Sequence, residues 1–508
     1  MTGHMVYKSI ERYGVLELKF KGFQEGNPFV DYYIKGTFSG KSEKITSNGF
    51  YDGNGIYIIR FMPSFEGEYN YHIEGSFSEQ IYEGNFFVSP AKENNHGPVR
   101  VADKFHFTYE DGTPYYPMGT TCYAWTHQPI KMQEETLNTL KNSPFNKIRF
   151  CIFPKHYDYN LYEPITFPYE GIPCDISDLS KENFMDYIPT NPDNHWEFKK
   201  FNPEHYQILE RRILDLMELG IQADLILMHP YDRWGFSYMD RESNALYVKY
   251  IVARFAAFRN VWWSLANEYD LCEAKTTSDW EEYGEILCKD DPYNRLRSIH
   301  NCKTIYDYKR PWITHCSIQR TEIYLSAANT KMWREQYGKP VVIDEAGYEG
   351  NINYSWGNLT GEEMVRLFWM AAVRGGYLGH GETYMHPEDK LWWSHGGTLY
   401  GESADRIGFL YKIISEVPGL GLEPVDIKKW EENSATAAHA GYRGKYFLFY
   451  TGHTRPSFKE FYFNNTKKYR VEVIDTWNMT ISDKGVYSGK FKIDLPSKEY
   501  MALRIVEV

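Results

Sequence analysis

The sequence is poor in cysteine and contains no long apolar run. Its seven cysteines, an odd number without a CxxC pair, give no basis for a disulfide framework. No uninterrupted apolar stretch approaches the roughly 18–20 residues of a membrane span. The first 25 residues carry charged side chains where a signal peptide would have an apolar core. These absences predict a cytoplasmic protein with free thiols.

Positive charge is also scarce. With 56 Lys and Arg against 68 Asp and Glu, the formal net charge is −12. The charges are dispersed along the chain and form no long block of one sign. Such a chain favours neither nucleic acid nor an anionic membrane as a partner. The composition leaves the oligomeric state open.

Changes of pattern along the chain predict three domains, because 508 residues exceed what a single core supports. Residues 1–95 contain short alternating runs such as Tyr57–Phe61 between turn signals, which is typical of a β-sandwich. Residues 96–420 alternate helical and strand patterns. Residues 421–508 return to strand patterns and predict a C-terminal β-sandwich.

The middle domain is predicted to be a (β/α)8 TIM barrel of the α/β class. Helical patterns, as at 203–216, separate about eight apolar runs. The long polar and aromatic segment at about 155–200 follows the second run and is expected to shape a substrate pocket. The predicted strands are Tyr116–Tyr123, Asn146–Phe153, 221–229, 261–267, Leu296–Asn301, Trp312–Ser317, Val341–Glu345 and Tyr377–His380.

Two glutamates stand at the ends of predicted strands. Glu268 follows the fourth strand directly after Asn267, and Glu345 ends the seventh. The C-terminal ends of barrel strands meet on one face, so the two carboxylates are expected in one pocket. Glycoside hydrolysis needs such a pair. Asp344 precedes Glu345, and because neighbouring side chains of a strand alternate, only one of these two should face the barrel interior.

This order of residues resembles glycoside hydrolase clan A. The resemblance implies a retaining mechanism in which Glu268 is the acid/base and Glu345 the nucleophile. The run Asn146–Phe150 looks like the clan's Asn-x-x-Arg pattern, which implies that Arg149 hydrogen-bonds the nucleophile and keeps it ionised. By the same resemblance, Asn267 would hold the 2-hydroxyl of the sugar.

A closer resemblance, spanning most of the chain, is to the apiosidase-like family of barrel hydrolases. The flanking β domains also look like the companions of multidomain members. One departure is Gly381-Glu382, which stands where His380 would run directly into Thr-Tyr-Gly. The resemblance places this strand end beside the sugar, so Glu382 is a candidate substrate contact. The segments that carry the resemblance are Asp111–Thr121, Tyr123–Trp125, His229-Pro230, Trp262–Glu268 and Gly375–Tyr384.

Histidines and tryptophans near strand ends supply further candidates. A metal site is one interpretation of the histidines, but amidohydrolase-type barrels begin with His-x-His, and the first strand has none. We therefore predict no metal and no cofactor, and contacts between histidines and sugar hydroxyls. Aromatic residues make up 17% of the chain, and some of their rings are expected to stack on sugar. The candidates are His229, His300, His315 and His380, and Trp125, Trp234, Trp392 and Trp393.

Together these patterns predict a retaining, exo-acting glycoside hydrolase for short oligosaccharides or glycosides. One alternative is a non-catalytic carbohydrate-binding protein on a barrel scaffold, and another is a metal-dependent barrel hydrolase. Loop geometry determines specificity, so the fold alone leaves the sugar and its linkage open.

Overall fold

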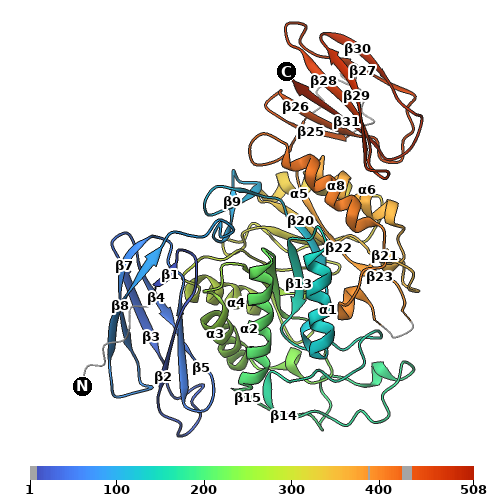
Figure 1. The fold of residues 1–508 in the computed structure, drawn as a ribbon. Helices are drawn as coiled ribbons and strands as arrows, with labels where there is room; N and C mark the ends of the chain where they lie inside the picture. Colours follow the sequence, from blue (N-terminus) through green and yellow to red (C-terminus); the bar gives the residue numbers. More distant parts are fainter. Residues whose placement is uncertain (1–8, 387–389, 426–437) are drawn as a thin grey trace.

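A computed structural model describes residues 9–386, 390–425 and 438–508 (Figure 1). The chain forms β-sheets at its N-terminal end, a barrel with surrounding helices in its middle, and further β-sheets at its C-terminal end. The N-terminal sheets lie beside helix α3, and the C-terminal sheets lie beyond helices α6 and α8. The predicted barrel with flanking β domains is confirmed; the boundaries at 95/96 and 420/421 stay predictions.

The N-terminal strands form two sheets that pack against each other. The orders are β1-β8-β7-β3-β4 and β2-β6-β5, and only the β1–β8 pair is parallel. The rings of Phe38 and Phe61, one from each sheet, stack with centroids 4.4 Å apart. The strands are β1 (Ser9–Glu11), β2 (Leu16–Lys21), β3 (Lys35–Gly40), β4 (Lys44–Asn48), β5 (Phe50–Tyr51), β6 (Ile56–Phe61), β7 (Gly67–Glu74) and β8 (Tyr82–Ser89).

Buried ion pairs attach these sheets to the barrel helices. Arg60 of β6 reaches Glu210 of helix α2 (Pro203–Glu218) at 2.5 Å. Arg254 of helix α3 (Arg241–Phe255) contacts the same carboxylate at 2.6 Å and also Asp52 at 2.7 Å. Because both guanidinium groups are buried, this junction depends on complete pairing of its charges.

Eight parallel strands form the barrel in the order β18-β17-β16-β13-β12-β22-β20-β19. The two edge strands are β18 and β19. They are joined by a parallel bridge between His300, just after β18, and Ser317 of β19. Each strand lies within or overlaps one of the predicted runs, and the fourth and seventh keep their predicted ranks. The strands are β12 (Met118–Thr121), β13 (Lys147–Cys151), β16 (Gln222–Met228), β17 (Val261–Ala266), β18 (Arg297–Ser298), β19 (Cys316–Gln319), β20 (Val341–Glu345) and β22 (Tyr377–His380).

Helices cover the outside of the barrel. Helix α2 begins as its sequence predicts: Pro203 is its first residue, and the side chain of Asn202 accepts a hydrogen bond from the backbone N–H of Glu204. Gly220 follows the helix with φ +74°, a conformation that favours glycine. The other helices are α1 (Ile130–Lys141), α4 (Thr277–Asp290), α5 (Thr330–Tyr337), α6 (Gly361–Ala372), α7 (Trp392–His395) and α8 (Ser403–Ser415).

The centre of the barrel contains a buried lysine between two aspartates. Lys147 of β13 lies 2.5 Å from Asp224 of β16 and 2.9 Å from Asp344 of β20. Below it, the small sheet β9 (Val99–Ala102), β10 (His106–Tyr109) and β11 (Pro114–Tyr115) closes the N-terminal end of the barrel. Phe107 of this sheet packs on Trp262 of β17 with centroids 5.4 Å apart.

The C-terminal strands form a six-stranded sheet, β24-β25-β26-β31-β28-β29, and a two-stranded one, β27-β30. Their core is separate from that of the barrel and includes Phe449, Phe461, Phe491 and Leu503. Arg504 pairs with Glu416, which follows α8. The strands are β24 (Glu423–Pro424), β25 (Ala438–Tyr442), β26 (Tyr446–Tyr450), β27 (Phe458–Tyr462), β28 (Tyr469–Asp475), β29 (Thr480–Tyr487), β30 (Lys490–Asp494) and β31 (Met501–Glu507).

The segment predicted to shape the pocket leaves the barrel after β13. It contains the antiparallel pair β14 (Tyr169–Ile172) and β15 (His195–Phe201).

All seven cysteines are free. Among the described residues, no helix combines the length and apolarity that crossing a membrane would require.

Candidate active site

A cavity lies at the C-terminal ends of the barrel strands, and both predicted glutamates line it. Most of the other lining residues are aromatic or polar and come from the segments that follow the strands. They are Tyr123, Lys155, Tyr157, Tyr231, Asn267, Gln319, Thr321, Tyr348, Trp356 and Trp393.

Glu268 lies directly after β17 in a left-handed backbone conformation, with φ +51° and ψ +55°. A residue other than glycine pays about 1–2 kcal/mol for this conformation, which is common at functional sites. The side chain is 5% exposed. The hydroxyl of Tyr231 donates a hydrogen bond to its Oε2, and Asn267 Nδ2 lies 3.4 Å from the same oxygen. Tyr231 and Asn267 therefore hold Oε2 of Glu268, and the residue lines the cavity.

Glu345 ends β20 and is 7% exposed. Its Oε1 accepts a hydrogen bond from the hydroxyl of Tyr123, and Arg149 Nη1 lies 3.4 Å away. Burial and the nearby charge of Glu268 raise the pKa of Glu345 to about 7, against the lowering effect of Arg149. Glu345 is therefore expected to hold a proton to a higher pH than an ordinary glutamate does.

Asp344 and Glu345 both face the barrel interior, so the prediction that only one would do so is wrong. Asp344 pairs with Lys147 across the barrel. Glu345 contacts Arg149, which lies two residues further along β13, toward the C-terminal end of the strand. The pairing of β19 with β20 slips at this point, since Ile318 pairs with Ile343 but Gln319 pairs with Glu345. This bulge leaves Asp344 as an extra residue and interrupts the strict alternation of the strand.

Arg149 and Asn267 connect the two glutamates. Arg149 Nη1 donates to Asn267 Oδ1 at 2.6 Å, while the same nitrogen lies 3.4 Å from Glu345. Arg149 Nη2 lies 3.4 Å from the hydroxyl of Ser264. Asn267 lines the cavity, whereas the buried Arg149 lies behind its wall. Both predicted residues therefore belong to the site, with Arg149 acting through its neighbours.

Trp125, Trp234 and His229 were predicted to contact substrate but do not line this cavity. Trp125 is fully buried and packs on Phe150. Trp234 is buried, and its indole N–H donates to Glu163 at 3.3 Å. His229 Nε2 lies 3.1 Å from the carbonyl oxygen of Phe153, and burial lowers its pKa to about 3. Direct contact with a sugar finds no support in this geometry, because each side chain is enclosed by protein.

His315 and His380 also lie outside the cavity. His315 packs on Trp262, with centroids 5.2 Å apart, toward the N-terminal end of the barrel. His380 stacks on Phe145 with centroids 4.6 Å apart, and its Nδ1 lies 3.0 Å from the hydroxyl of Thr120. Burial lowers the pKa of both histidines to about 3. Like His229, they are neutral parts of the barrel packing.

Glu382 organises a loop at the edge of the barrel. Its carboxylate accepts hydrogen bonds from the backbone N–H groups of Tyr400 and Gly401 at 2.5 and 2.8 Å, and burial raises its pKa to about 7. Glu349 lies beside it in the paired strands β21 (Glu349–Gly350) and β23 (Glu382–Thr383). Contact between Glu382 and substrate therefore also lacks support, because the carboxylate is occupied by the backbone before α8.

Among the described residues, one group has a spacing that could hold a metal ion: Glu349, His380 and Glu382, whose ligand atoms lie within 4.8 Å of one another. Both carboxylates already accept backbone N–H groups, including those of Glu402 and Ser403 on Glu349. These bonds account for the cluster as an anchor of the segment that leads into α8. The group does not line the cavity of Glu268 and Glu345.

Several residues of the cavity were not among the main predictions. Tyr123, Lys155, Tyr231 and Tyr348 all follow barrel strands within a few residues. The rule that selected Glu268, a polar residue after a C-terminal strand end, applies to them as well. Trp393, named as one of four candidate stacking residues, does line the cavity.

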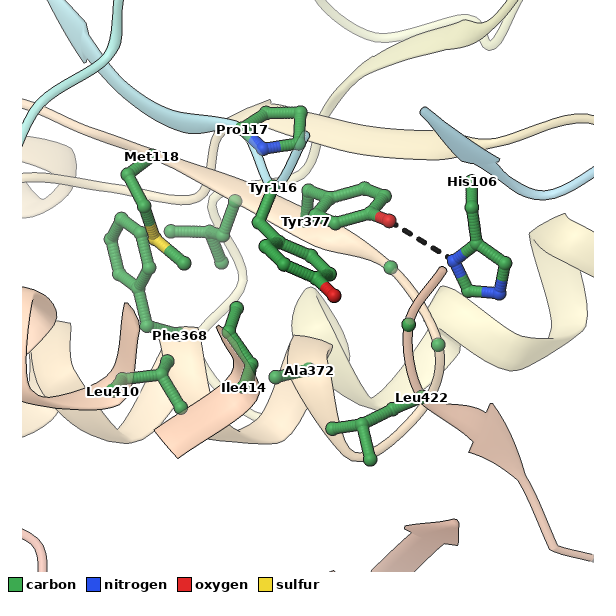
Figure 2. Close-up of a pocket in the computed structure, with 14 residues that line it drawn as sticks. His106, Tyr116, Pro117, Met118, Phe368, Ala372, Tyr377, Leu410, Ile414 and Leu422 are labelled. Atoms are coloured by element: carbon green, nitrogen blue, oxygen red, sulfur yellow. Dashed lines mark hydrogen bonds between the residues drawn. The ribbon is translucent and has the colours of Figure 1, made fainter. Parts of the chain in front are cut away.

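A second cavity lies at the opposite end of the barrel (Figure 2). Met118 and Tyr377, the first residues of β12 and β22, form one side, and residues of α6 and α8 form the other. Its lining is largely apolar, apart from a hydrogen bond between Tyr377 and His106 at 3.1 Å. We assign it to packing between the barrel and its helices, because the N-terminal face of such barrels serves stability.

The comparisons with known proteins agree with this geometry. The family described as "Apiosidase-like, catalytic domain" matches residues 102–434, which is more than half of the chain. The chain belongs to the apiosidase-like family. Domains of unknown function, DUF5060 and DUF5605, match residues 9–76 and 430–506 of this apiosidase-like protein. A comparison with curated proteins gives no match.

Solved structures extend the similarity to the whole chain. A protein assigned as a glycoside hydrolase from Bacteroides vulgatus ATCC 8482 is 39% identical, with a TM-score of 0.89 over 98% of this chain and 100% of its own. A glycoside hydrolase family 5 protein from the same organism is 14% identical, with a TM-score of 0.58 over 81% of this chain and 94% of its own. The second likeness concerns the fold alone.

Proposed function

We propose that this apiosidase-like protein is a retaining glycoside hydrolase of short oligosaccharides or glycosides. The observation that carries the proposal is the pair of buried carboxyl groups, Glu268 after β17 and Glu345 at the end of β20, on one cavity. The reaction also needs an ionised nucleophile, and the contact of Arg149 with Glu345 favours the negative charge on this residue.

In the first step, a carboxylate oxygen of Glu345 forms a bond to the anomeric carbon while the glycosidic C–O bond breaks. The proton of Glu268 moves to the departing oxygen. The second step reverses these roles: Glu268 takes a proton from water, the water oxygen bonds to the anomeric carbon, and Glu345 leaves as a carboxylate. Arg149, 3.4 Å from Glu345, favours the charge on the nucleophile before attack and after release.

Asn267 is suited to hold the hydroxyl next to the reacting carbon. Its Oδ1 is occupied by Arg149, which orients the amide so that Nδ2 faces Glu268. An N–H donor at this place can bind a sugar hydroxyl, and such a bond strengthens as charge develops in the transition state.

Exo action is the second part of the proposal. The rings of Tyr157, Tyr354, Trp356 and Trp393 contact one another at centroid distances of 5.1–6.5 Å, and all but Tyr354 line the cavity. A short aromatic enclosure suits a terminal sugar better than the middle of a long chain.

The seven free cysteines are consistent with a reducing, cytoplasmic location.

An activity screen tests the proposal. Wild-type protein is incubated with aryl β-glycosides, including apiosyl, xylosyl, galactosyl and glucosyl, and the anomeric form of the first product is followed by NMR. Retention is expected for the sugar that is cleaved, and inversion would contradict the assigned roles. Glu345→Gln should abolish hydrolysis, whereas Glu273→Gln, on the surface, should not. Binding of sugar without any hydrolysis would favour the carbohydrate-binding alternative, and loss of activity on chelation would favour a metal-dependent enzyme.

A further inference from the structure

Lys155 is enclosed by aromatic rings in the wall of the cavity. It follows β13, is 3% exposed, and lines the cavity with both glutamates. Its Nζ lies 3.8 Å from the ring centroid of Tyr123, 4.3 Å from that of Tyr231 and 4.6 Å from that of Trp393. Three ring faces within 5 Å stabilise a cation, by about 2 kcal/mol or more for a desolvated contact.

No oxygen among the described residues accepts a hydrogen bond from Lys155 Nζ. The other two cations of the barrel interior differ in this respect. Lys147 is paired with Asp224 and Asp344, and Arg149 donates to Asn267 and contacts Glu345. An ammonium group carries three N–H donors, and burying it costs several kcal/mol when oxygen partners are missing. Burial accordingly lowers the pKa of Lys155.

The charges of Glu268 and Glu345 act on this ammonium group, and a molecule in the cavity can supply the hydrogen-bond acceptor that it lacks. Neutral sugar hydroxyls have uncharged partners available there, such as Asn267, Gln319 and the hydroxyl of Tyr157. A buried positive charge offers more to an anionic oxygen, because a charge-assisted hydrogen bond is roughly twice as strong as a neutral one. A carboxylate on the sugar would supply both the acceptor and the opposite charge.

We propose that Lys155 binds the carboxylate of a uronic acid, so that the substrates of this site are uronides. The inference rests on the proposed glycosidase function and narrows its substrate class. It assigns Lys155 to specificity, while Glu268 and Glu345 carry out the bond cleavage. A neutral hexose of the same stereochemistry would leave the ammonium without its partner and bind less well.

The test compares matched substrates. Nitrophenyl β-glucuronide is paired with nitrophenyl β-glucoside, and the galacturonide with the galactoside, and kcat/KM is measured for each. Wild type is expected to prefer one uronide over its neutral partner by about 30-fold or more. Lys155→Met, which keeps the length of the side chain without its charge, should lower this ratio about 30-fold, to near one, and Lys155→Arg should retain part of the preference. Lys41→Met, at an exposed lysine of the N-terminal sheets, is the control.

Two results would overturn the inference. One is a wild-type preference for the neutral glycoside of each pair. The other is an equal loss on both members of a pair in Lys155→Met, which would mean that Lys155 acts on the glutamates. Thermal unfolding of each variant identifies a folding defect. If Lys155→Met does not fold, the ratio of kcat/KM between uronide and neutral glycoside is measured for Lys155→Arg, which keeps the charge. A retained preference for the uronide supports the inference, and its absence contradicts it.

Calorimetric titration with the free uronic acids separates this inference from the proposed function. If no glycoside is hydrolysed but glucuronic or galacturonic acid binds to wild type and not to Lys155→Met, the inference holds while the hydrolase proposal fails. If neutral glycosides are hydrolysed and neither uronic acid binds, the hydrolase proposal holds and the inference fails. Absence of both hydrolysis and binding contradicts both.

Discussion

Replacement of Glu345 by glutamine should change how the stability of the protein depends on pH. Burial, with the nearby charge of Glu268, raises the pKa of Glu345 from 4.5 to about 7. Between pH 4.5 and about pH 7, Glu345 therefore holds a proton in the folded protein that it has released in the unfolded chain. The stability linked to this group is therefore fully present below pH 4.5 and is lost as the pH rises through about 7. At 1.36 kcal/mol per pH unit, the full loss is about 3 kcal/mol.

Glutamine has nearly the same shape as glutamate and does not ionise, so it removes this pH-dependent loss. The free energy of unfolding of Glu345→Gln, relative to wild type, should rise by about 2–3 kcal/mol between about pH 5 and pH 8. Urea unfolding followed by tryptophan fluorescence measures this difference at each pH. A weaker contact with Arg149 would shift all the values equally and leave the slope unchanged.

Asp344→Asn is the matched control at the neighbouring position. Although burial alone would raise it, Lys147 holds the pKa of Asp344 below its ordinary value, so this residue is ionised in both states across the same pH range. Its replacement should cost about 3–5 kcal/mol because a buried ion pair is broken, but by the same amount at each pH. A flat difference for Glu345→Gln as well would refute the conclusion that the pKa of Glu345 is raised in the folded protein.

Three further predictions concern other parts of the molecule. Glu268→Gln should lower kcat about 10²–10⁴-fold on glycosides with poor leaving groups and much less on dinitrophenyl glycosides, which need no acid; equal losses would argue against Glu268 as the acid. Trp393→Ala should raise KM about 30-fold through the loss of about 2 kcal/mol of apolar contact, and an unchanged KM would place the sugar elsewhere. Arg60→Met should destabilise the fold by about 2–3 kcal/mol because Glu210 loses one of its two buried partners, whereas Lys19→Met at an exposed pair should cost less than about 1 kcal/mol in the same urea titration.

The order of barrel strands could be predicted because it follows from features that lie close together in the sequence. Apolar runs between helical patterns identify the strands, and their count places Glu268 after the fourth and Glu345 at the end of the seventh. In a parallel barrel this rank alone brings the two carboxyl groups to the same face. Arg149 could be included for the same reason, since it lies on β13 one alternation step above Lys147.

Side-chain direction beyond the strand ends could not be predicted in this way. His229 and His380 lie at strand ends, as Glu268 does, yet they face protein, whereas Lys155 and Tyr231 lie in the loops and line the cavity. Strands have a period of two that assigns each side chain to a face, but loops have no period. Packing against neighbouring loops orients their side chains, and these neighbours come from distant parts of the sequence.

The sequence by itself determined the barrel, the rank of its strands and the two glutamates at their ends, because apolar periodicity and chain order are local properties. Only the tertiary structure decided which side chains meet. The bulge that turns both Asp344 and Glu345 inward depends on how β19 pairs with β20. The enclosure of Lys155 depends on rings that follow β12, β16 and β23. Such contacts join residues more than 20 positions apart, and the energy of packing them together selects their geometry.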